Sequence, residues 1–483
     1  MDDHVSRILK MLEEGKITAT EAQTLIAALK TDPPPGTTTS NSGSKPEAKA
    51  DTSAQKTEGA KAKSFEFQWS QKKGFPLDLS GLGKQITDAV KKIDPERIVR
   101  EAREGMARGG RRFNQRFKGF GFFTDLDDGR PENTLGQPTA RAAESLDFDI
   151  GEGSNIQVEN NWGSIAVFGG GEKVVLEYDK EAWAPTEPEA KARLDELNVE
   201  AGLHAPEGGP SRLEVRVTAP DNWRDGVVNL RLHVPENVNL KLATVFGDAR
   251  VENIAGPVEV HAITGLVTLD NLRGEVTAEG ISGEIHATKI VGALHIASKS
   301  GNIKAEGLSR GGTIAGVSGD VTVSDVEGGR LEAKSVSGDV FVSKAGKQQP
   351  VDITLESVSG NLKLEDARGN ITLKTVSGHV TGVGLDALTL QAQTVSGSVD
   401  AALETPFAGT LTANTVSGDV SIVAPAASNF RFTIATQSGV LECAHEAHDS
   451  NRSDTLWTGA VGTGAGTVTV QTRSGDVRLE KTA

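Results

Sequence analysis

From about residue 245 to the C-terminus, apolar and polar residues alternate in short runs, and most of these runs follow a glycine. After Gly319, for example, Val321 and Val323 are apolar, whereas Thr322 and Ser324 are polar. Alternation with a period of two predicts short β-strands that turn one face inward and the other face to solvent.

The phrase Val-Ser-Gly-Asp, or a close copy of it, returns every 18 to 22 residues, and further glycines lie about midway, as at Gly274 and Gly292. Two strands per repeat predict a mainly β fold, a β-solenoid over residues 140–483 whose coils of 18 to 22 residues stack about 4.8 Å apart. The last gap, from Gly439 to Gly475, fits two coils of 18. The predicted structural turn glycines are Gly283, Gly301, Gly319, Gly338, Gly360, Gly378, Gly397 and Gly418.

The residue after the repeat glycine is often acidic or an amide, as at Asp320, Asp339 and Asn361. Such side chains bond nearby backbone groups in turns. Stacked carboxylates could instead form a calcium ladder, which needs several oxygen ligands held together. Leu266 and Val440 occupy this position in two coils and interrupt a ladder. We therefore expect a structural turn, with no metal and no cofactor.

The N-terminal part has a different pattern. Residues 1–30 predict a helical hairpin, in which Thr18 and Glu21 form a capping box for the second helix. Thirty residues bury too little apolar surface to be stable alone, so we expect the hairpin to bind a protein partner or to form a homo-oligomer. Residues 31–63 contain no aromatic residue and are rich in Pro, Thr, Ser, Ala and Lys, which predicts a disordered linker.

Residues 64–130 predict a basic, amphipathic, Phe-rich helical segment. Within it, residues 84–118 carry eleven Lys or Arg and five Asp or Glu, a net charge of +6, although the whole chain has −15. The candidate contact residues are Arg111, Arg112, Phe113, Arg116, Phe117, Lys118 and Phe120.

Three interpretations of this segment remain open. Its phenylalanines could cap the open end of the solenoid. Residues 84–123 could bind an anionic membrane surface or a partner, because basic residues beside exposed aromatic rings suit that interface. Single-stranded nucleic acid would use the same chemistry. Nucleic acid is not the partner we expect, because the chain as a whole is acidic.

Cysteine content and the lack of long apolar runs limit the possible covalent links and the location of the chain. Cys443 is the single cysteine, so intramolecular disulfides and thiolate metal clusters are impossible. No secretory signal and no run of about 18 apolar residues is present, so we expect a soluble, cytoplasmic protein that can lie peripherally at the inner face of the membrane.

Residues 185–197 predict an inserted short helix. His445 and His448 have metal-ligand spacing, but we interpret them as residues of a surface loop.

The N-terminal ILKMLEEGKITATEAQTLIAAL, with its Lys-Ile-Thr-x-x-Glu-Ala core, and the repeated Val-Ser-Gly-Asp-Val phrase together resemble a bacterial family. This is the toastrack family of β-strand-repeat proteins, which also carries an adhesin label and is joined to a SHOCT-like helical hairpin. The resemblance implies a role in sensing or signalling cell-envelope stress. It supplies no catalytic residues.

These observations favour a non-enzymatic scaffold that acts through protein interactions. The alternative is a surface adhesin or a polysaccharide-acting β-helix protein. Enzymes of the latter kind need a pair of carboxylates on one exposed face. In the repeats the outward positions alternate among Lys, Glu, Thr and Ser without a repeated acidic pair, which favours the scaffold.

Overall fold

The computed structural model describes residues 133, 136–205, 210–220 and 223–482. These residues form 31 strands and one helix, so the mainly β class is confirmed. The predicted helical hairpin, linker and Phe-rich segment lie outside the described residues and stay predictions.

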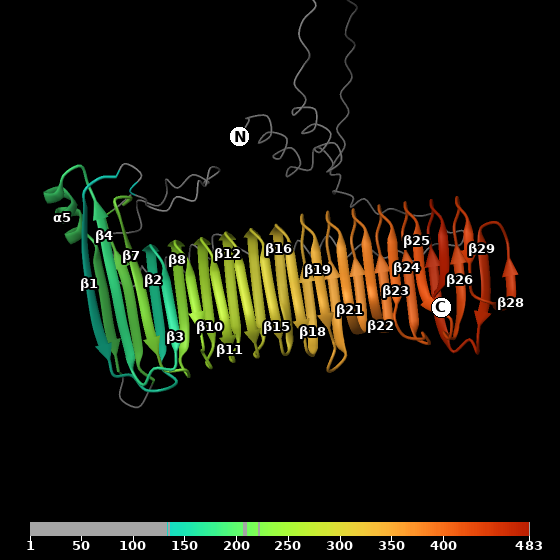
Figure 1. Ribbon diagram of the computed structural model, residues 1–483, viewed down its shortest axis with the longest axis horizontal. Helices are drawn as coiled ribbons and strands as arrows, with labels where there is room; N and C mark the ends of the chain where they lie inside the picture. Colours follow the sequence, from blue (N-terminus) through green and yellow to red (C-terminus); the bar gives the residue numbers. More distant parts are fainter. Residues whose placement is uncertain (1–132, 134–135, 206–209, 221–222, 483) are drawn as a thin grey trace, which may run out of the picture. The chain divides into compact units, whose positions relative to one another are not determined.

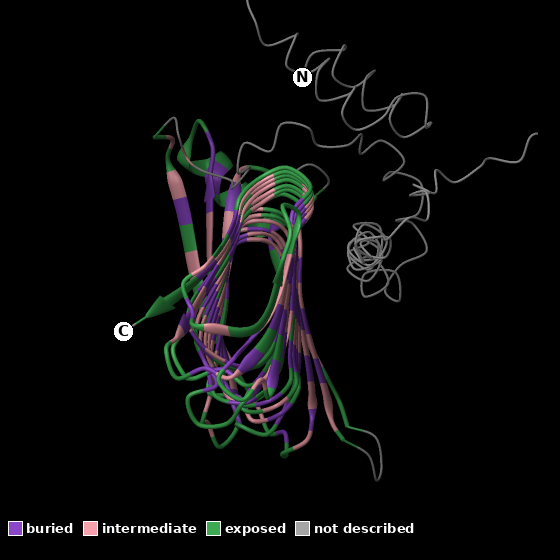
Figure 2. Ribbon diagram, turned by 90° about the vertical axis from the view of Figure 1, so that its right-hand side faces the viewer, coloured by how far each residue is buried: buried purple, intermediate pink, exposed green. Residues whose placement is uncertain are grey.

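Along most of the chain, each strand pairs in parallel with the strand two places later. Val258 of one strand lies beside Val276, and Val276 lies beside Leu294, an offset of 18 residues. The offset rises to 22 where Val340 lies beside Leu362. The strands therefore form two facing walls, which we name wall A and wall B (Figures 1 and 2). One strand of each wall makes a coil, and the coils make the coil stack.

The bounds of the strands follow from this pairing. Wall A contains β2 (Asn155–Trp162), β5 (Asn198–His204), β6 (Arg212–Thr218), β8 (Asn239–Phe246), β10 (Val258–Thr264), β12 (Val276–Ser282), β14 (Leu294–Ser300), β16 (Gly311–Ser318), β18 (Gly329–Lys334), β20 (Val351–Glu356), β24 (Thr410–Asn414), β26 (Phe430–Ala435), β28 (Ala447–Arg452), β29 (Leu456–Val461) and β30 (Gly466–Gln471). Wall B contains β1 (Thr139–Phe148), β3 (Ile165–Gly169), β4 (Val174–Trp183), β7 (Gly226–Val234), β9 (Ala249–Glu252), β11 (Val267–Leu272), β13 (Ile285–Ile290), β15 (Ile303–Leu308), β17 (Val321–Val326), β19 (Val340–Ala345), β23 (Val399–Leu403), β25 (Val420–Pro425), β27 (Leu441–Cys443) and β31 (Val477–Thr482). β21 (Leu362–Lys374) and β22 (Val380–Gln393) run through both walls, which joins all the described strands into one sheet.

The core lies between the two walls. In β17 the side chains of Val321 and Val323 are buried, whereas Thr322 and Ser324 are partly exposed, as the alternation predicts. Most inward positions are Val, Ile, Leu or Ala, and the aromatic rings Phe430 and Phe432 fill the terminal coil. The coil stack is therefore a thin core of small apolar residues, and its stability depends on how closely successive coils pack.

The Val-Ser-Gly-Asp phrase forms the turn from wall A to wall B. Gly338 has a φ of 152°, which few other residues adopt. A Cβ atom at this position would lie 2.2 Å from the carbonyl oxygen of Gly319 in the preceding coil. Gly360 has no such φ, yet a Cβ atom there would lie 2.0 Å from the carbonyl oxygen of Gly338. Both positions therefore require glycine because the coils lie so close together, whereas the backbone angle requires it only at Gly338.

Threonines before the turn bond to the same column of carbonyl groups. Thr394 Oγ1 donates to the carbonyl oxygen of Gly378 at 3.0 Å, and Thr415 Oγ1 donates to that of Gly397 at 2.9 Å. Both threonines are buried. Each Thr-Val-Ser-Gly phrase thus contacts the glycine of the preceding coil through its first residue and its last, which explains why both recur.

The polar residue after the glycine accepts a backbone hydrogen bond from the next coil. The N–H of Asp339 donates to Asp320 Oδ1 at 2.9 Å, and the N–H of Asn361 donates to Asp339 Oδ1 at 2.7 Å. His379 continues the row by donating its N–H to Asn361 Oδ1. These side chains are bonded into the turn as acceptors, which is the structural role expected of them.

Both ends of the coil stack depart from chain order. At the N-terminal end, the coil of β2 and β3 lies between the coil of β6 and β7 and the coil of β8 and β9. The helix α5 (Glu187–Glu196) packs on β1 and β4, and Thr186 caps it, so the prediction of a helix at 185–197 is confirmed.

At the C-terminal end, the coil of β30 and β31 lies between the coil of β24 and β25 and the coil of β26 and β27. The prediction of two coils between Gly439 and Gly475 is wrong. Residues 447–461 instead form the antiparallel strands β28 and β29, which extend wall A. The sequence of β28, AHDSNR, lacks the alternating apolar residues that a coil needs.

We predict that Gly338→Ala lowers the free energy of unfolding by more than about 2 kcal/mol, because the new Cβ would meet a backbone carbonyl group. Gly360→Ala should cost a similar amount, although its backbone angle suits alanine. Gly328→Ala is the matched control, since its nearest neighbours would lie 3.7 Å away. Thermal and denaturant unfolding measure all three, and equal midpoints for Gly338→Ala and Gly328→Ala would contradict the contact.

Candidate functional site

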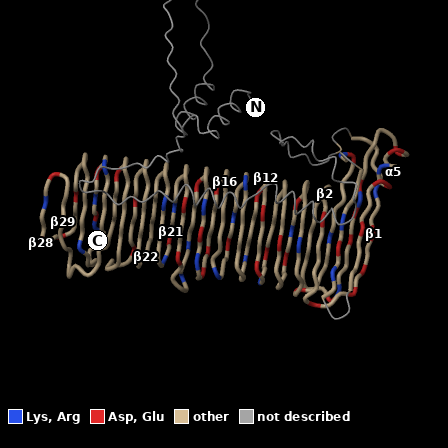
Figure 3. The backbone as a smooth tube through the Cα atoms, turned by 180° about the vertical axis from the view of Figure 1, so that it is seen from behind, with Lys and Arg blue, Asp and Glu red and all other residues tan. Residues whose placement is uncertain are grey.

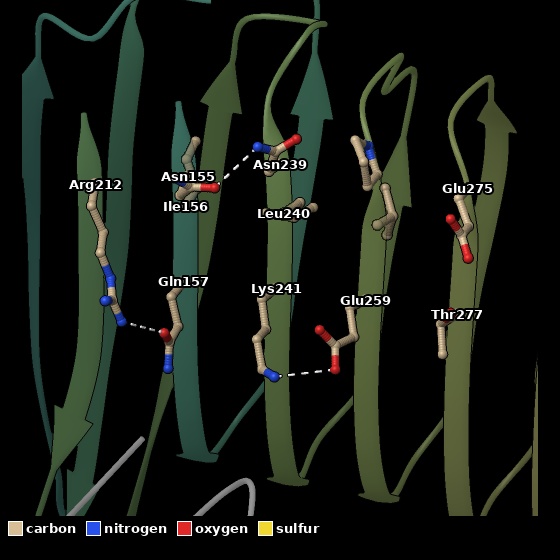
Figure 4. Close-up of a pocket in the computed structure, with 12 residues that line it drawn as sticks. Asn155, Ile156, Gln157, Arg212, Asn239, Leu240, Lys241, Glu259, Glu275 and Thr277 are labelled. Carbon is tan, nitrogen blue, oxygen red and sulfur yellow. Dashed lines mark hydrogen bonds and ion pairs between the residues drawn. The ribbon is translucent and has the colours of Figure 1, made fainter. Parts of the chain in front are cut away.

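A polar recess of about 570 Å³ lies on the outer face of wall A, near the N-terminal end of the coil stack (Figure 4). Side chains from β2, β6, β8, β10 and β12 line it. These strands are neighbours in wall A, although β2 and β12 are far apart in the sequence. The recess is therefore a product of the stacking order at this end.

Polar side chains that line the recess bond across neighbouring strands. Arg212 Nη2 donates to Gln157 Oε1 at 2.9 Å, and Lys241 Nζ lies 3.1 Å from Glu259 Oε1 (Figure 4). The parallel register causes these contacts, because it places Gln157, Lys241 and Glu259 at the same level of successive strands. The recess thus presents a row of polar groups whose positions are fixed by the strands.

A buried ion cluster lies beside the recess. His261 Nε2 lies 2.6 Å from Glu259 Oε1, and His261 Nδ1 lies 3.3 Å from Glu279 Oε2. His261 is 3% exposed, although its position faces outward. Burial alone would lower the pKa of His261, but the hydrogen bonds with Glu259 and Glu279 outweigh it and raise the pKa to about 9. The hydrogen bond from His261 lowers the pKa of Glu259 to about 2.

These pKa values restrict what the cluster can do near pH 7. His261 keeps its proton and Glu259 stays ionised, so neither group is poised to exchange a proton with a substrate. Within the cluster, Glu259 lines the recess and is the group that offers a fixed charge to a polar surface. No group of three or more His, Cys, Asp or Glu side chains among the described residues has the arrangement of a metal site.

The predicted site residues lie in two places. The candidate contacts from Arg111 to Phe120 lie outside the described residues. The eight predicted turn glycines lie in the described coils, in the turns that lead from wall A to wall B. Seven of these eight described glycines have positive φ, and Gly360 is the exception.

The interpretation of His445 and His448 as surface-loop residues is wrong for His445. His445 is buried, and its Nε2 lies 3.1 Å from the carbonyl oxygen of Glu480. His448 belongs to strand β28, and its Nε2 lies 2.7 Å from the carbonyl oxygen of Gly462. Each ring therefore bonds to a different backbone carbonyl group, which is a structural role.

The sequence interpretation did not single out Arg212, Lys241, Glu259 or His261. A signal was present, because Lys241, Glu259 and Thr277 occur at intervals of 18 residues on the outward phase of the repeat. Arg212 carries no such signal, since β6 reaches the row only through the altered stacking order at this end.

Acidic and basic side chains are interspersed along the coil stack, without a large region of one sign (Figure 3). Within the part of the chain that the structure describes, no helix is long and apolar enough to cross a membrane. The described surface thus offers local charge patterns for recognition, and the recess is one of them.

Comparisons with known proteins confirm the family resemblance. Residues 294–480 match the family model of Toastrack DUF4097, and residues 5–33 match that of a SHOCT-like domain. No curated protein matches. The toastrack match covers most of the regular coils and ends within β31, whereas the recess lies N-terminal to it.

Two solved structures were also found. A "putative cell adhesion protein" from Clostridium sporogenes is 8% identical and covers 71% of this chain and 100% of its own, with a TM-score of 0.16. A "Putative lipid binding protein" from Parabacteroides distasonis is 13% identical and covers 70% of this chain and 96% of its own, with a TM-score of 0.22. Superpositions this poor support no argument about this chain.

We predict that His261→Gln destabilises the coil stack in a pH-dependent way. The pKa of His261 is raised by folding, so its contribution is fully present below about pH 6.5 and is lost as the pH rises through about 9. The loss should be about 1.5–3 kcal/mol at pH 6, as for hydrogen bonds to charged groups. It should be much smaller at pH 10.

Denaturant unfolding at both pH values measures this loss. His286→Gln is the matched control, because His286 pairs with Glu284 at 3.1 Å on an exposed surface, and such pairs contribute at most about 1 kcal/mol. A loss for His261→Gln that is the same at pH 6 and pH 10 would contradict the ion cluster.

Proposed function

We propose that this chain is a non-enzymatic β-solenoid scaffold that binds a protein partner and acts in sensing or signalling cell-envelope stress. The envelope role rests on the match of its two segments to the toastrack and SHOCT-like models. The scaffold role rests on the geometry of the described residues.

One observation carries the scaffold role: polar side chains on the outer face of wall A are held in register by neighbouring strands. Gln157, Lys241 and Glu259 come from three adjacent strands, and the ladder fixes their spacing. A partner that matches this spacing need not order the groups itself, so less conformational entropy is lost on binding.

The proposal that the chain is not an enzyme has support from the charged groups. His261 and Glu259 hold fixed charges near neutral pH. The repeated carboxylates Asp320 and Asp339 accept backbone hydrogen bonds from the next coil. A polysaccharide-acting enzyme needs carboxylates that face its substrate. The scaffold is therefore favoured over that alternative.

The remaining parts of the proposal concern residues that the structure does not describe. Residues 1–30 would form a homo-oligomer or bind a partner through two apolar faces. Residues 84–123 would bring the chain to an anionic membrane, which suits a cytoplasmic protein at the inner face of the membrane.

A photo-crosslinking amino acid at Thr277 tests the recess as a partner site. Thr277 lies beside the recess on the outer face of wall A, and Thr322 provides a matched position on the outer face of wall B, with similar exposure. We expect Thr277 to capture one protein in cells under envelope stress, and the double variant Arg212→Glu, Lys241→Glu to abolish that adduct. The same adducts from Thr277 and Thr322 would contradict a site in the recess.

Sedimentation with vesicles tests the membrane contact. We predict that the full chain sediments with phosphatidylserine-rich vesicles at low salt and far less with neutral vesicles, since each basic residue near the surface contributes about 1 kcal/mol. Changing Phe113, Phe117 and Phe120 to Ser should weaken binding without lowering the melting temperature. Phe341→Ser is the control, because Phe341 lies on the outer face of wall B.

Three results would reject the membrane contact. Equal sedimentation with both kinds of vesicle would show that electrostatic attraction does not drive the binding. Tighter binding to single-stranded DNA in the same salt would favour nucleic acid. A triple variant that melts early and has no vesicle binding to lose would favour the cap.

A further inference from the structure

The two walls end at different places at the C-terminal end of the coil stack. β26 and β27 form the terminal coil, and wall A continues past it with β29 and then β28 (Figure 1). Wall B stops at β27, which has three residues. Among the described residues, no strand continues wall B alongside β29 and β28.

The free side of β27 carries backbone groups that can bond to another strand. On the side that faces β31, β27 is already paired: the N–H of Val477 donates to the carbonyl oxygen of Val440, and the N–H of Ala444 donates to that of Leu479. In a parallel pair, alternate residues bond to one neighbour, so Leu441 and Cys443 direct their backbone groups to the free side. Arg452 Nη2 donates to the carbonyl oxygen of Leu441 at 3.0 Å, which partly covers this edge.

A groove of about 380 Å³ runs beside β27. Cys443, Arg452 and Trp457 are among the residues that line it, and the Arg452 guanidinium lies 4.3 Å from the centre of the Trp457 ring. One large apolar side chain of the groove is well exposed, since Val440 is 51% exposed. An open strand edge beside a groove that holds an aromatic ring is an arrangement that can accept an added β-strand.

We propose that residues 64–69 of this chain add to the free edge of β27 as one further strand of wall B. Their sequence, SFEFQW, alternates aromatic and polar residues with the period of a β-strand, so these first six residues of the segment 64–130 depart from the helical pattern predicted for the segment as a whole. In this register Phe65, Phe67 and Trp69 face the groove and Trp457, and the polar residues between them face outward. The aromatic rings would bury the apolar surface that the uneven walls leave exposed.

Charge and reach favour this occupant. Lys61, Lys63, Lys72 and Lys73 flank the segment, and Glu446 and Asp454 lie close to β27 and β28 in the sequence. Glu442 and Asp449 also lie there, and they are paired with Arg478 and His448. Wall B has sixteen described strands, including the wall B parts of β21 and β22, so its length is about 70 Å. The 63 residues between Trp69 and Asn133 can span about 200 Å when extended. The segment can therefore reach the far end of its own chain.

Disulfide trapping in the full chain tests the proposal, because Cys443 is the single natural cysteine and faces the same way as the buried Leu441. Single cysteines replace Phe65, Phe67, Trp69, Glu66 and Gln68 in turn. Burial raises the pKa of the Cys443 thiol, so oxidation by diamide is run at alkaline pH. Products are read as monomers or dimers on non-reducing gels.

We expect Phe65→Cys, Phe67→Cys or Trp69→Cys to form an intramolecular disulfide with Cys443, and Glu66→Cys and Gln68→Cys to form little. That period of two is what a docked strand requires, since neighbouring residues point to opposite faces. Equal trapping at all five positions would show only a nearby flexible tether and would overturn the proposal. Dimeric products would assign the edge to a second copy, and no trapping at any position would leave it unoccupied, so either result also overturns it.

Hydrogen exchange supplies a readout that does not depend on thiol chemistry. The amides of Leu441 and Cys443 should exchange faster when Phe65, Phe67 and Trp69 are all changed to Ser, while the amides of β17 keep their rates. Unchanged exchange at Leu441 and Cys443 would overturn the proposal, whatever the gels show.

Discussion

The structure depends on how closely one coil approaches the next at the turn from wall A to wall B. The carbonyl oxygen of each repeat glycine points at the next coil, where a Cβ atom would lie about 2 Å away, as between Gly378 and Gly397. Glycine is required there because a side chain would hold the coils apart. The buried hydroxyl of Thr394 then donates to that carbonyl group. One short contact thus sets the coil spacing, the register and the residue types of the phrase.

This constraint also shapes the surface that is available for function. Because the register is fixed, outward side chains repeat at set intervals along wall A, and Lys241, Glu259 and His261 come together by that means. At the two ends of the coil stack the strand pairing departs from this regular repeat. There the chain interleaves its first and last coils and adds antiparallel strands, and the recess and the groove beside β27 lie near these ends. We therefore expect binding sites near the two ends of the coil stack, where other strand pairings replace the regular repeat.

The regular part of the fold could be predicted from the sequence because period-two alternation and a recurring glycine are local signals. Asp320 and Asp339 were predicted as turn residues on the same basis. The interleaving of β30 and β31 could not be predicted, because it changes which coils are neighbours without changing the local pattern. Repeats alone therefore suggested two further coils after Gly439.

Some features of the regular coils were also missed. Asn271 and Lys289 both have left-handed backbones, with φ of 53° and 54°, and each precedes a buried apolar residue at the end of a wall B strand. Asparagine is common in that conformation and lysine is not, so residue type could not identify the position. The burial of His261 was missed because its outward phase predicts exposure, whereas Glu259 and Glu279 pack around it.

The central claim, that one coil is the unit of the fold, is tested most directly by deleting one. Removal of residues 320–338 joins Gly319 to Asp339 and deletes one coil, from one repeat glycine to the next. We predict that this variant unfolds cooperatively with a native circular dichroism spectrum. Removal of residues 320–328 deletes half a coil, so the strands that follow would have to change walls, and it should prevent folding. Similar unfolding curves for the two deletions would contradict the account.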